Sequence, residues 1–283
     1  MTSIAMYMNS ILKLFRVGDG LVYDSLVIWS LIYLILILRK IDITVIIAGL
    51  LVWISVRIAF AVNVITDIKE DSLNPNGIKK NILLANTELI YVAKLLVGSI
   101  VLMSLLLATI VFQPIAALLY LIQLGLCITY SVPPRWKTRP PLDLIAHGFF
   151  FGVGIPLIIF YAFNVELSLP IMLLITSIFF YSMCFELGNH VRDYHYDLAA
   201  GLKTSAIIMG YKNSVKINGA FALTGLLLST LALIALSNEY LLVFIAQFLM
   251  LGLLVLKFSS LRLKHSYILL MIPLIEFLLL QLI

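Results

Sequence analysis

Hydrophobic residues follow one another in long, nearly uninterrupted runs along this chain, and short polar segments separate the runs. Several runs reach about 18 residues or more, the length that an α-helix needs to cross about 30 Å of hydrocarbon at 1.5 Å per residue. The pattern predicts nine transmembrane helices, over residues 21–38, 43–66, 88–112, 114–132, 142–163, 169–191, 215–236, 239–258 and 266–283. We therefore expect an all-α integral membrane bundle that forms a single domain over residues 1–283.

The composition agrees with this pattern. Of the 283 residues, 63% are hydrophobic and 12% are charged, and the charged share is about half that of a soluble globular domain. This excludes a disordered chain and an ordinary soluble enzyme. The formal net charge is +5, but the basic residues lie between the predicted spans, so we expect a lipid bilayer and no nucleic acid as partner. Nothing in the sequence indicates an oligomeric state.

The basic residues also predict the orientation of the bundle. Fifteen Lys and Arg residues lie in the N-terminal segment and in the connections after the second, fourth, sixth and eighth spans, whereas the opposite connections contain only Arg39 and Lys40. Since cytoplasmic loops carry the excess of Lys and Arg, the N-terminus and the even-numbered connections are expected to be cytoplasmic. The longest polar connections lie on that side, so we expect the functional loops there.

Acidic residues recur at regular spacing at the ends of two predicted spans. The second and the sixth spans each end in the pattern N-x-x-x-D-x-x-x-D. The two sets of residues are Asn63, Asp67 and Asp71, and Asn189, Asp193 and Asp197. Residues four positions apart lie on one face of a helix, about 6 Å apart, so each set forms a stripe of oxygen-bearing side chains. Both spans run toward the cytoplasm, and we expect the two stripes to face each other at the same depth.

The two stripes favour a magnesium and diphosphate site. Four carboxylates brought together repel one another unless a cation lies between them. Mg²⁺ prefers oxygen ligands, takes one or two carboxylates, and completes its octahedron with water and substrate phosphate. The predicted metal ligands are Asn63, Asp67, Asp71, Asp193 and Asp197. Asn189 is expected to contact the same diphosphate oxygens. The alternative is that these acids are helix ends in interfacial water.

A basic segment follows the fourth predicted span. It reads Tyr-Ser-Val-Pro-Pro-Arg-Trp-Lys-Thr-Arg-Pro over residues 130–140, and its prolines end the helix. Arg135 offers a bidentate fork and Lys137 a compact charge, so we expect both of them, with Tyr130, to contact the diphosphate. Lys203 lies in a glycine-containing turn after the second stripe and is expected to order over the same group. The alternative is that these cations only set the topology.

These motifs resemble the UbiA superfamily of intramembrane prenyltransferases. In that family the motifs N-D-x-x-D-x-x-x-D and D-x-x-x-D bind Mg²⁺ and a polyprenyl diphosphate within a nine-helix bundle. The first stripe matches the first motif, although Val64 stands at the usual second-position aspartate, and Asp193 and Asp197 match the second motif. The Tyr-Ser-x-Pro-Pro segment at residues 130–134 and its basic tail are also similar to the family.

The resemblance implies a Mg²⁺-dependent enzyme that moves a (poly)prenyl group from an allylic prenyl diphosphate to a lipophilic acceptor, such as a quinone-precursor aromatic. Asp67, Asp193, Lys137 and Glu186 are the expected catalytic residues. Alternatives are an archaeal-type lipid or carotenoid prenyltransferase, a terpene cyclase or a diphosphate hydrolase. A membrane transporter with acidic ion sites is an alternative from another class.

Two charged residues lie inside predicted spans. Glu186 continues the second stripe about two turns deeper into the membrane, where a carboxylate costs roughly 2.5–3.5 kcal/mol on insertion scales and is usually functional. We predict that Glu186 orients the acceptor or takes the proton released on attack; a structural hydrogen bond is the alternative. Arg57 is a candidate cavity residue that contacts the donor, unless snorkelling or an ion pair with Glu186 accounts for its position.

Overall fold

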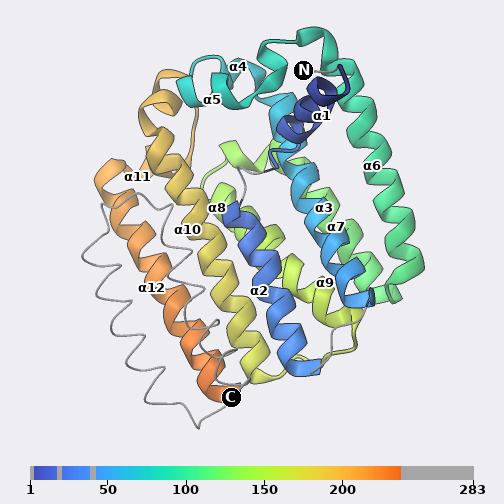
Figure 1. Ribbon diagram of the computed structural model, residues 1–283. Coiled ribbons are helices and arrows are strands. Elements are labelled where there is room, and N and C mark those ends of the chain that lie inside the picture. The colour runs from blue at the N-terminus through green and yellow to red at the C-terminus, as the bar shows by residue number, and fades with distance from the viewer. Residues whose placement is uncertain (1–2, 18–20, 39–42, 237–283) are drawn as a thin grey trace.

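The computed structural model describes residues 3–17, 21–38 and 43–236, and all regular structure within these residues is helical. Figure 1 shows the long helices running side by side as a bundle, with α1, α4 and α5 at one end of it. The helices are α1 (Ser3–Leu14), α2 (Leu21–Leu38), α3 (Ile43–Thr66), α4 (Ile68–Asp71), α5 (Pro75–Lys80), η1 (Ile82–Leu84), η2 (Thr87–Leu89), α6 (Ile90–Val111), α7 (Pro114–Ser131), η3 (Trp136–Thr138), α8 (Leu142–His147), η4 (Gly148–Gly154), α9 (Ile155–Ala162), α10 (Leu169–Ala199), α11 (Ser205–Met209) and α12 (Tyr211–Leu236).

The first seven predicted spans coincide with described helices. Six of these helices are long and apolar enough to cross a membrane, and α2 contributes a shorter apolar stretch at Tyr23–Ile35. The fifth span consists of α8, η4 and α9 in succession. The sixth continues as helix to Ala199, beyond the expected end at residue 191. The predicted spans 239–258 and 266–283 lie outside the described residues.

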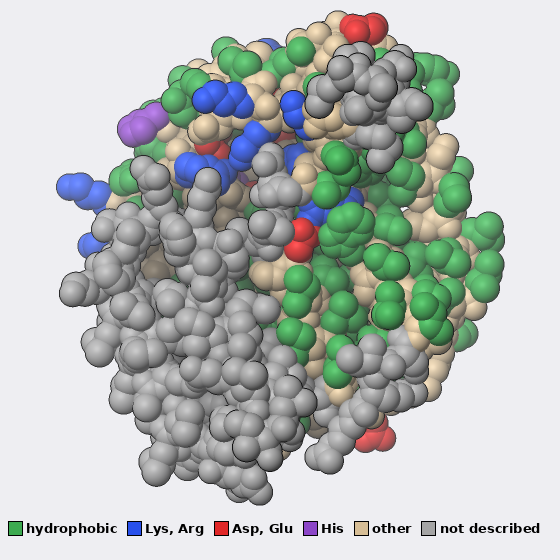
Figure 2. Space-filling view, viewed as in Figure 1, with side chains coloured by type: hydrophobic (Ala, Val, Ile, Leu, Met, Phe, Trp, Pro, Cys, Tyr) green, Lys and Arg blue, Asp and Glu red, His purple; other side chains and the backbone are tan. Residues whose placement is uncertain are grey.

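The burial of the helices separates the centre of the bundle from its edge. In the most apolar windows of α3 and α10, 67% of residues are buried, against 17% in α6. Most of the exposed side chains of α6 are hydrophobic, and Leu102, Met103 and Ile110 are each at least 70% exposed. Figure 2 shows hydrophobic side chains covering the side of the molecule on which α6 lies. Such a surface suits lipid, because lipid tails are as apolar as these side chains.

A glycine contact brings η4 against the middle of α10. A Cβ atom on Gly152 would lie 2.4 Å from the Cα atom of Phe179 in α10, so only glycine permits this approach. The segment Gly148–Gly154 is π-helical, and such segments inside α-helices frequently occur at functional sites. Here the π-helical segment starts directly after His147, whose surroundings are described below.

Candidate active site

The first acidic stripe keeps its helical spacing across the junction of α3 and α4. Asp67 lies at this junction with φ −99° and ψ 16°. Its N–H still donates to the Asn63 carbonyl at 2.9 Å, and the Asp71 N–H donates to the Asp67 carbonyl at 2.7 Å. The three side chains therefore lie along one face, as the sequence spacing predicted. Asp67 is 8% exposed, which places its carboxylate inside the protein rather than in open water.

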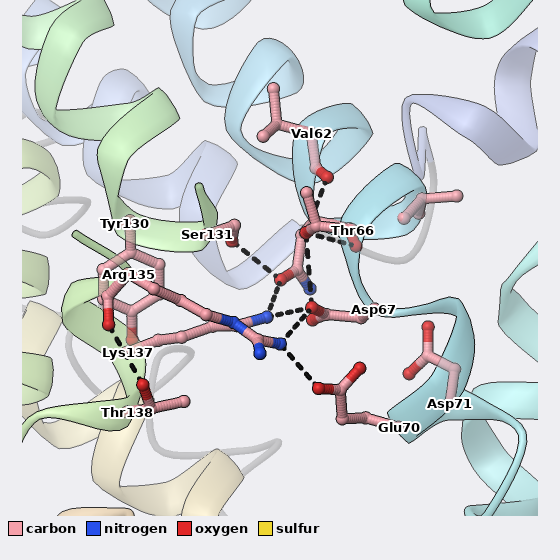
Figure 3. Close-up of polar contacts among 12 residues, drawn as sticks. Val62, Thr66, Asp67, Glu70, Asp71, Tyr130, Ser131, Arg135, Lys137 and Thr138 are labelled. Carbon is pink, nitrogen blue, oxygen red and sulfur yellow. Dashed lines mark hydrogen bonds and ion pairs between the residues drawn. The ribbon is translucent and has the colours of Figure 1, made fainter. Parts of the chain in front are cut away.

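Two cations from the segment after α7 reach this stripe. Arg135 has a left-handed backbone with φ 57°. Its guanidinium nitrogen lies 3.2 Å from Asp67 Oδ1 and 2.7 Å from Glu70 Oε1. Lys137 Nζ donates to Asn63 Oδ1 at 3.0 Å and forms an ion pair with Asp67. In Figure 3 both side chains extend from the α7 side toward Asp67. Asp67 and the neighbouring Glu70 thus have neutralising partners within the chain.

The pKa values of two acids at this junction move in opposite directions. Burial acts to raise the pKa of Glu70, but its hydrogen bond and ion pair with Arg135 outweigh burial and leave the pKa below its ordinary value. Burial, together with the nearby Asp67 charge, raises the pKa of Asp71 even though Asp71 accepts a hydrogen bond from Asn81. Asp71 is therefore the acid of the first stripe whose burial outweighs the effect of its hydrogen bond and of the nearby cations on its pKa.

The second stripe lies on the last turns of α10 and meets the connection that follows the first. Asn74 Nδ2 donates to Asp193 Oδ1 at 3.2 Å. Arg192 lies beside the same carboxylate, 3.0 Å from Oδ2. Because Asn74 follows Asp71 by only three residues, this contact brings the ends of α4 and α10 together. Figure 2 shows Lys and Arg side chains gathered with acidic side chains on this end of the molecule.

The acids of the two stripes form an open arrangement rather than a closed cage. Within residues 3–17, 21–38 and 43–236, no group of three or more His, Cys, Asp or Glu side chains is placed to hold a metal ion by itself. An ion at this site would need further oxygen ligands from water or from a bound phosphate group.

Two residues that were expected to contact the donor point deeper into the bundle. The Tyr130 hydroxyl donates to Glu186 Oε1 at 2.5 Å. Asn189 Nδ2 donates to the Tyr23 hydroxyl and, at 3.2 Å, to Glu186 Oε2. Both side chains are thus bound to a buried cluster around Glu186 rather than to Asp193 or Asp197.

The cluster contains three residues that sequence analysis did not single out. His147 Nε2 lies 3.5 Å from Glu186 Oε2, and His190 Nε2 lies 3.2 Å from Glu186 Oε1. His190 Nδ1 is 3.6 Å from Asp143 Oδ2. A local signal existed, because Glu186 and His190, like Asp143 and His147, are four positions apart on one helical segment. The pairing between the two segments has no counterpart in the sequence.

Arg57 pairs with residues outside the acidic stripes. It is 2% exposed and forms an ion pair with Asp24 of α2. Trp53 Nε1 donates to the same carboxylate at 2.9 Å, and Arg57 also donates to the Arg16 carbonyl at 2.9 Å. The alternative pairing of Arg57 with Glu186 is wrong. Asp24 comes from a neighbouring helix and supplies the counter-charge of the guanidinium, so this ion pair connects α2 to α3.

Lys203 is exposed in the short loop between α10 and α11. The end of this loop is bound to Asp143, which is fully buried. The Asp143 carboxylate accepts hydrogen bonds from the backbone N–H of Ser205 at 2.6 Å and from the Ser205 hydroxyl at 2.5 Å. The base of the loop is therefore anchored, while the Lys203 side chain is free of the protein interior.

The sequence matches the UbiA prenyltransferase family over residues 25–267. The chain therefore belongs to this family of prenyltransferases, as its motifs indicated. No curated protein sequence matches the chain.

Solved structures share the fold. A UbiA homolog from Archaeoglobus fulgidus bound to GPP and Mg²⁺ is similar with a TM-score of 0.70 and 18% identity, covering 92% of this chain and 99% of that chain. The same homolog bound to DMAPP and Mg²⁺ gives a TM-score of 0.67 and 18% identity, covering 92% and 98%. The structure of a digeranylgeranylglyceryl phosphate synthase is similar with a TM-score of 0.66 and 21% identity, covering 96% of this chain and 97% of that chain.

Proposed function

We propose that the protein is a Mg²⁺-dependent intramembrane prenyltransferase that moves a (poly)prenyl group from an allylic diphosphate to a lipophilic acceptor, with its active site on the cytoplasmic side. The observation that carries this proposal is the meeting of two acidic helix ends, from α3–α4 and α10, with Arg135 and Lys137 beside them. The bound GPP, DMAPP and Mg²⁺ of similarly folded proteins support it.

The oxygen atoms at this site suit Mg²⁺. They belong to carboxylates and an amide, the hard ligands that this ion prefers. Two of them, on Asn63 and Asp67, already hold a cation, the ammonium of Lys137. Asn63, Asp67, Asp71, Asp193 and Asp197 would hold the ion, with water and diphosphate as its further ligands. When bound, Mg²⁺ neutralises the charge that develops on the departing diphosphate.

The cations of the chain bind the same diphosphate. Lys137 and Arg135 both form ion pairs with Asp67 in the free protein. Phosphate oxygens offer these two cations stronger charge-assisted hydrogen bonds than one shared carboxylate does. Lys203, on an anchored loop after α10, would be a further cation for the diphosphate. The carbon–oxygen bond of the donor breaks with its electron pair going to the diphosphate, and the acceptor supplies the pair for the new bond and loses a proton.

Aromatic side chains pack together beside Asn189, and their presence supports a lipophilic acceptor. The ring of Tyr23 packs against Phe60 at 5.1 Å and Phe151 at 5.2 Å between centroids. Such rings stabilise a developing allylic cation through their π faces. They also accommodate an aromatic or polyene acceptor. A quinone-precursor aromatic is the acceptor that we favour, and lipid and carotenoid acceptors are outcomes of the experiment below.

Product analysis tests the proposal. The full chain in lipid nanodiscs would receive geranyl diphosphate and Mg²⁺ with 1,4-dihydroxy-2-naphthoate, geranylgeranylglyceryl phosphate or lycopene. We expect a prenylated product from one acceptor and at least about a 100-fold loss in Asp67→Asn and Asp193→Asn. Glu166→Gln, an exposed acid in the connection between α9 and α10, is the matched control.

Three results would contradict the proposal in different ways. Near-normal Mg²⁺-dependent turnover in both aspartate variants would exclude the metal assignment. Consumption of the donor without any acceptor, giving a cyclised or hydrolysed product, would assign the protein to a cyclase or hydrolase instead. Binding of the acceptors without consumption of the donor would exclude a transferase.

A further inference from the structure

Glu186 lies on the same face of α10 as the second acidic stripe but deeper in the bundle. Asp193 follows it by seven residues, which corresponds to about 10 Å along the helix axis. This separation is too large for Glu186 to bind the same ion as Asp193, and it places the carboxylate deeper in the bundle than the proposed diphosphate site, at a depth suited to a lipophilic acceptor.

The surroundings of Glu186 hold it as a hydrogen-bond acceptor. Tyr130 donates to Oε1 and Asn189 donates to Oε2, while His190 Nε2 lies 3.2 Å from Oε1. Hydrogen bonds of this kind stabilise an ionised carboxylate. The side chain of Glu186 remains 12% exposed, whereas that of Asp143 is 0% exposed. Glu186 is therefore the carboxylate of the cluster that a ligand can reach.

The hydrogen bonds of Ser182 fix the tautomer of His147. The Ser182 hydroxyl donates its single hydrogen to the His147 carbonyl at 2.8 Å. The same hydroxyl lies 2.8 Å from His147 Nδ1, so it must accept there, and Nδ1 carries a hydrogen. In the neutral ring the other nitrogen, Nε2, then has a lone pair.

This lone pair faces the Glu186 carboxylate. His147 Nε2 and Glu186 Oε2 are 3.5 Å apart, which is longer than a normal hydrogen bond of about 2.7–3.2 Å. Two acceptor atoms repel each other at this separation, and one added proton turns the repulsion into a charge-assisted hydrogen bond. The two side chains therefore form a site that binds one proton more favourably than either group would by itself.

A second histidine extends the cluster toward the acidic stripe. His190 is 7% exposed, and its Nδ1 has no hydrogen-bond partner among the described residues. This atom lies 3.6 Å from Asp143 Oδ2, while Nε2 is beside Glu186. His190 is one turn closer than Glu186 to the end of α10 that carries Asp193 and Asp197, so it lies between the deep carboxylate and the polar end of the bundle.

We propose that Glu186 accepts the proton that the acceptor loses during prenyl transfer, with His147 as the positioning residue that shares this proton. The acceptor forms its new bond to the allylic carbon, its own C–H or O–H bond breaks, and the proton moves to Glu186 Oε2. The inference rests on the proposed transferase activity and holds for acceptors in which the new bond replaces a C–H or O–H bond, because these lose one proton per turnover.

The experiment separates donor binding from transfer in the full chain in nanodiscs. Mg²⁺-dependent binding of geranyl diphosphate and transfer to the acceptor that the wild-type protein uses are measured in parallel. For Glu186→Gln, which keeps the size of the side chain, we expect unchanged donor affinity and a fall in the transfer kcat of about 100-fold or more. Deuterium at the position that loses the proton should slow transfer in this variant.

Two further variants support the assignment. His147→Asn keeps an N–H donor near the position of Nδ1 for Ser182 and removes Nε2, and it should lower kcat about tenfold at unchanged donor affinity. Tyr181→Phe is the control, because it removes one buried hydrogen bond of α10, to Ser229, away from the cluster. This control should retain the wild-type kcat.

The results distinguish the two proposals. A Glu186→Gln protein with kcat within about threefold of wild type, or with donor affinity and kcat lowered together, overturns the proton-acceptor role. If that variant does not fold, an unchanged kcat in His147→Asn overturns it. A wild-type protein that transfers no prenyl group overturns the proposed function and this inference with it, whereas active wild-type protein with an active Glu186→Gln variant overturns the inference alone.

Discussion

Lys137 and Asp67 form an ion pair across the site, although 70 positions separate them in the chain. Asp67 is the buried acid of the first stripe, and Lys137 comes from the loop that ends α7. The pair places a cation on the oxygens that we expect to hold Mg²⁺. On the proposed function, the ion and the ammonium would compete for the same carboxylate in the free protein, and a bound diphosphate would give the ammonium another partner.

Lys137→Met should therefore lower stability in the absence of Mg²⁺ and weaken donor binding. Asp67 loses its nearest partner but keeps Arg135 at 3.2 Å, so we expect a loss of about 1–3 kcal/mol, below the cost of a fully unpaired buried charge. Added Mg²⁺ should raise the thermal unfolding midpoint more in the variant than in the wild type. The exposed Lys69→Met is the control. Wild-type donor affinity in Lys137→Met would remove this residue from the site.

Glu70→Gln should make the protein less sensitive to acid. The pKa of Glu70 is lowered in the folded state, because Arg135 outweighs burial, so its stabilising contribution is present above the unfolded pKa of about 4.3 and is lost as the pH falls through the lower folded value. We expect the wild type to exceed the variant by about 0.5–1 kcal/mol at pH 7, since the pair is partly exposed. Thermal unfolding from pH 7 to pH 3 should show this difference shrinking; a constant difference would contradict the assignment.

Asp24→Asn should act on stability and leave donor binding intact. The change leaves the guanidinium of Arg57 buried without its counter-charge, which typically costs about 3–5 kcal/mol. The double variant Asp24→Leu with Arg57→Met removes both charges and should be less destabilised than Asp24→Asn. Thermal unfolding and Mg²⁺-dependent donor binding are measured on the same preparations. A selective loss of donor affinity at unchanged stability would return Arg57 to the donor site.

Gly152→Ala should separate η4 from α10. The new Cβ would lie 2.4 Å from the Phe179 Cα atom, and because that atom belongs to the backbone, a helix must shift. Overpacking of this kind costs about 1–3 kcal/mol. The control is Gly98→Ala on α6, where no atom lies within 4 Å of the added carbon; its unfolding midpoint should stay near the wild-type value. Equal midpoints for the two variants would show that η4 and α10 do not depend on this contact.

Properties that are local in the chain were open to prediction from the sequence. The length of each apolar run determines whether a helix can cross a membrane, so the first seven spans were predicted at their observed places, although the sixth continues beyond its expected end at residue 191 to Ala199. Spacing of four residues determines which side chains share a helix face, and the stripe from Asn63 to Asp71 keeps its hydrogen bonds through a break in the helix. Prolines after Ser131 end α7 where the sequence indicated.

The partners of the charged residues depended on the tertiary structure. Asp24 for Arg57, Asp67 for Lys137 and His147 for Glu186 all come from other helices. Apolar runs of similar length and hydropathy do not encode which helices become neighbours, nor how far each one rotates about its axis. Those choices follow from packing over the whole bundle, such as the glycine contact between η4 and α10. The sequence alone therefore singled out the acids and cations that we assign to the site, and only the packed helices decided which of them meet.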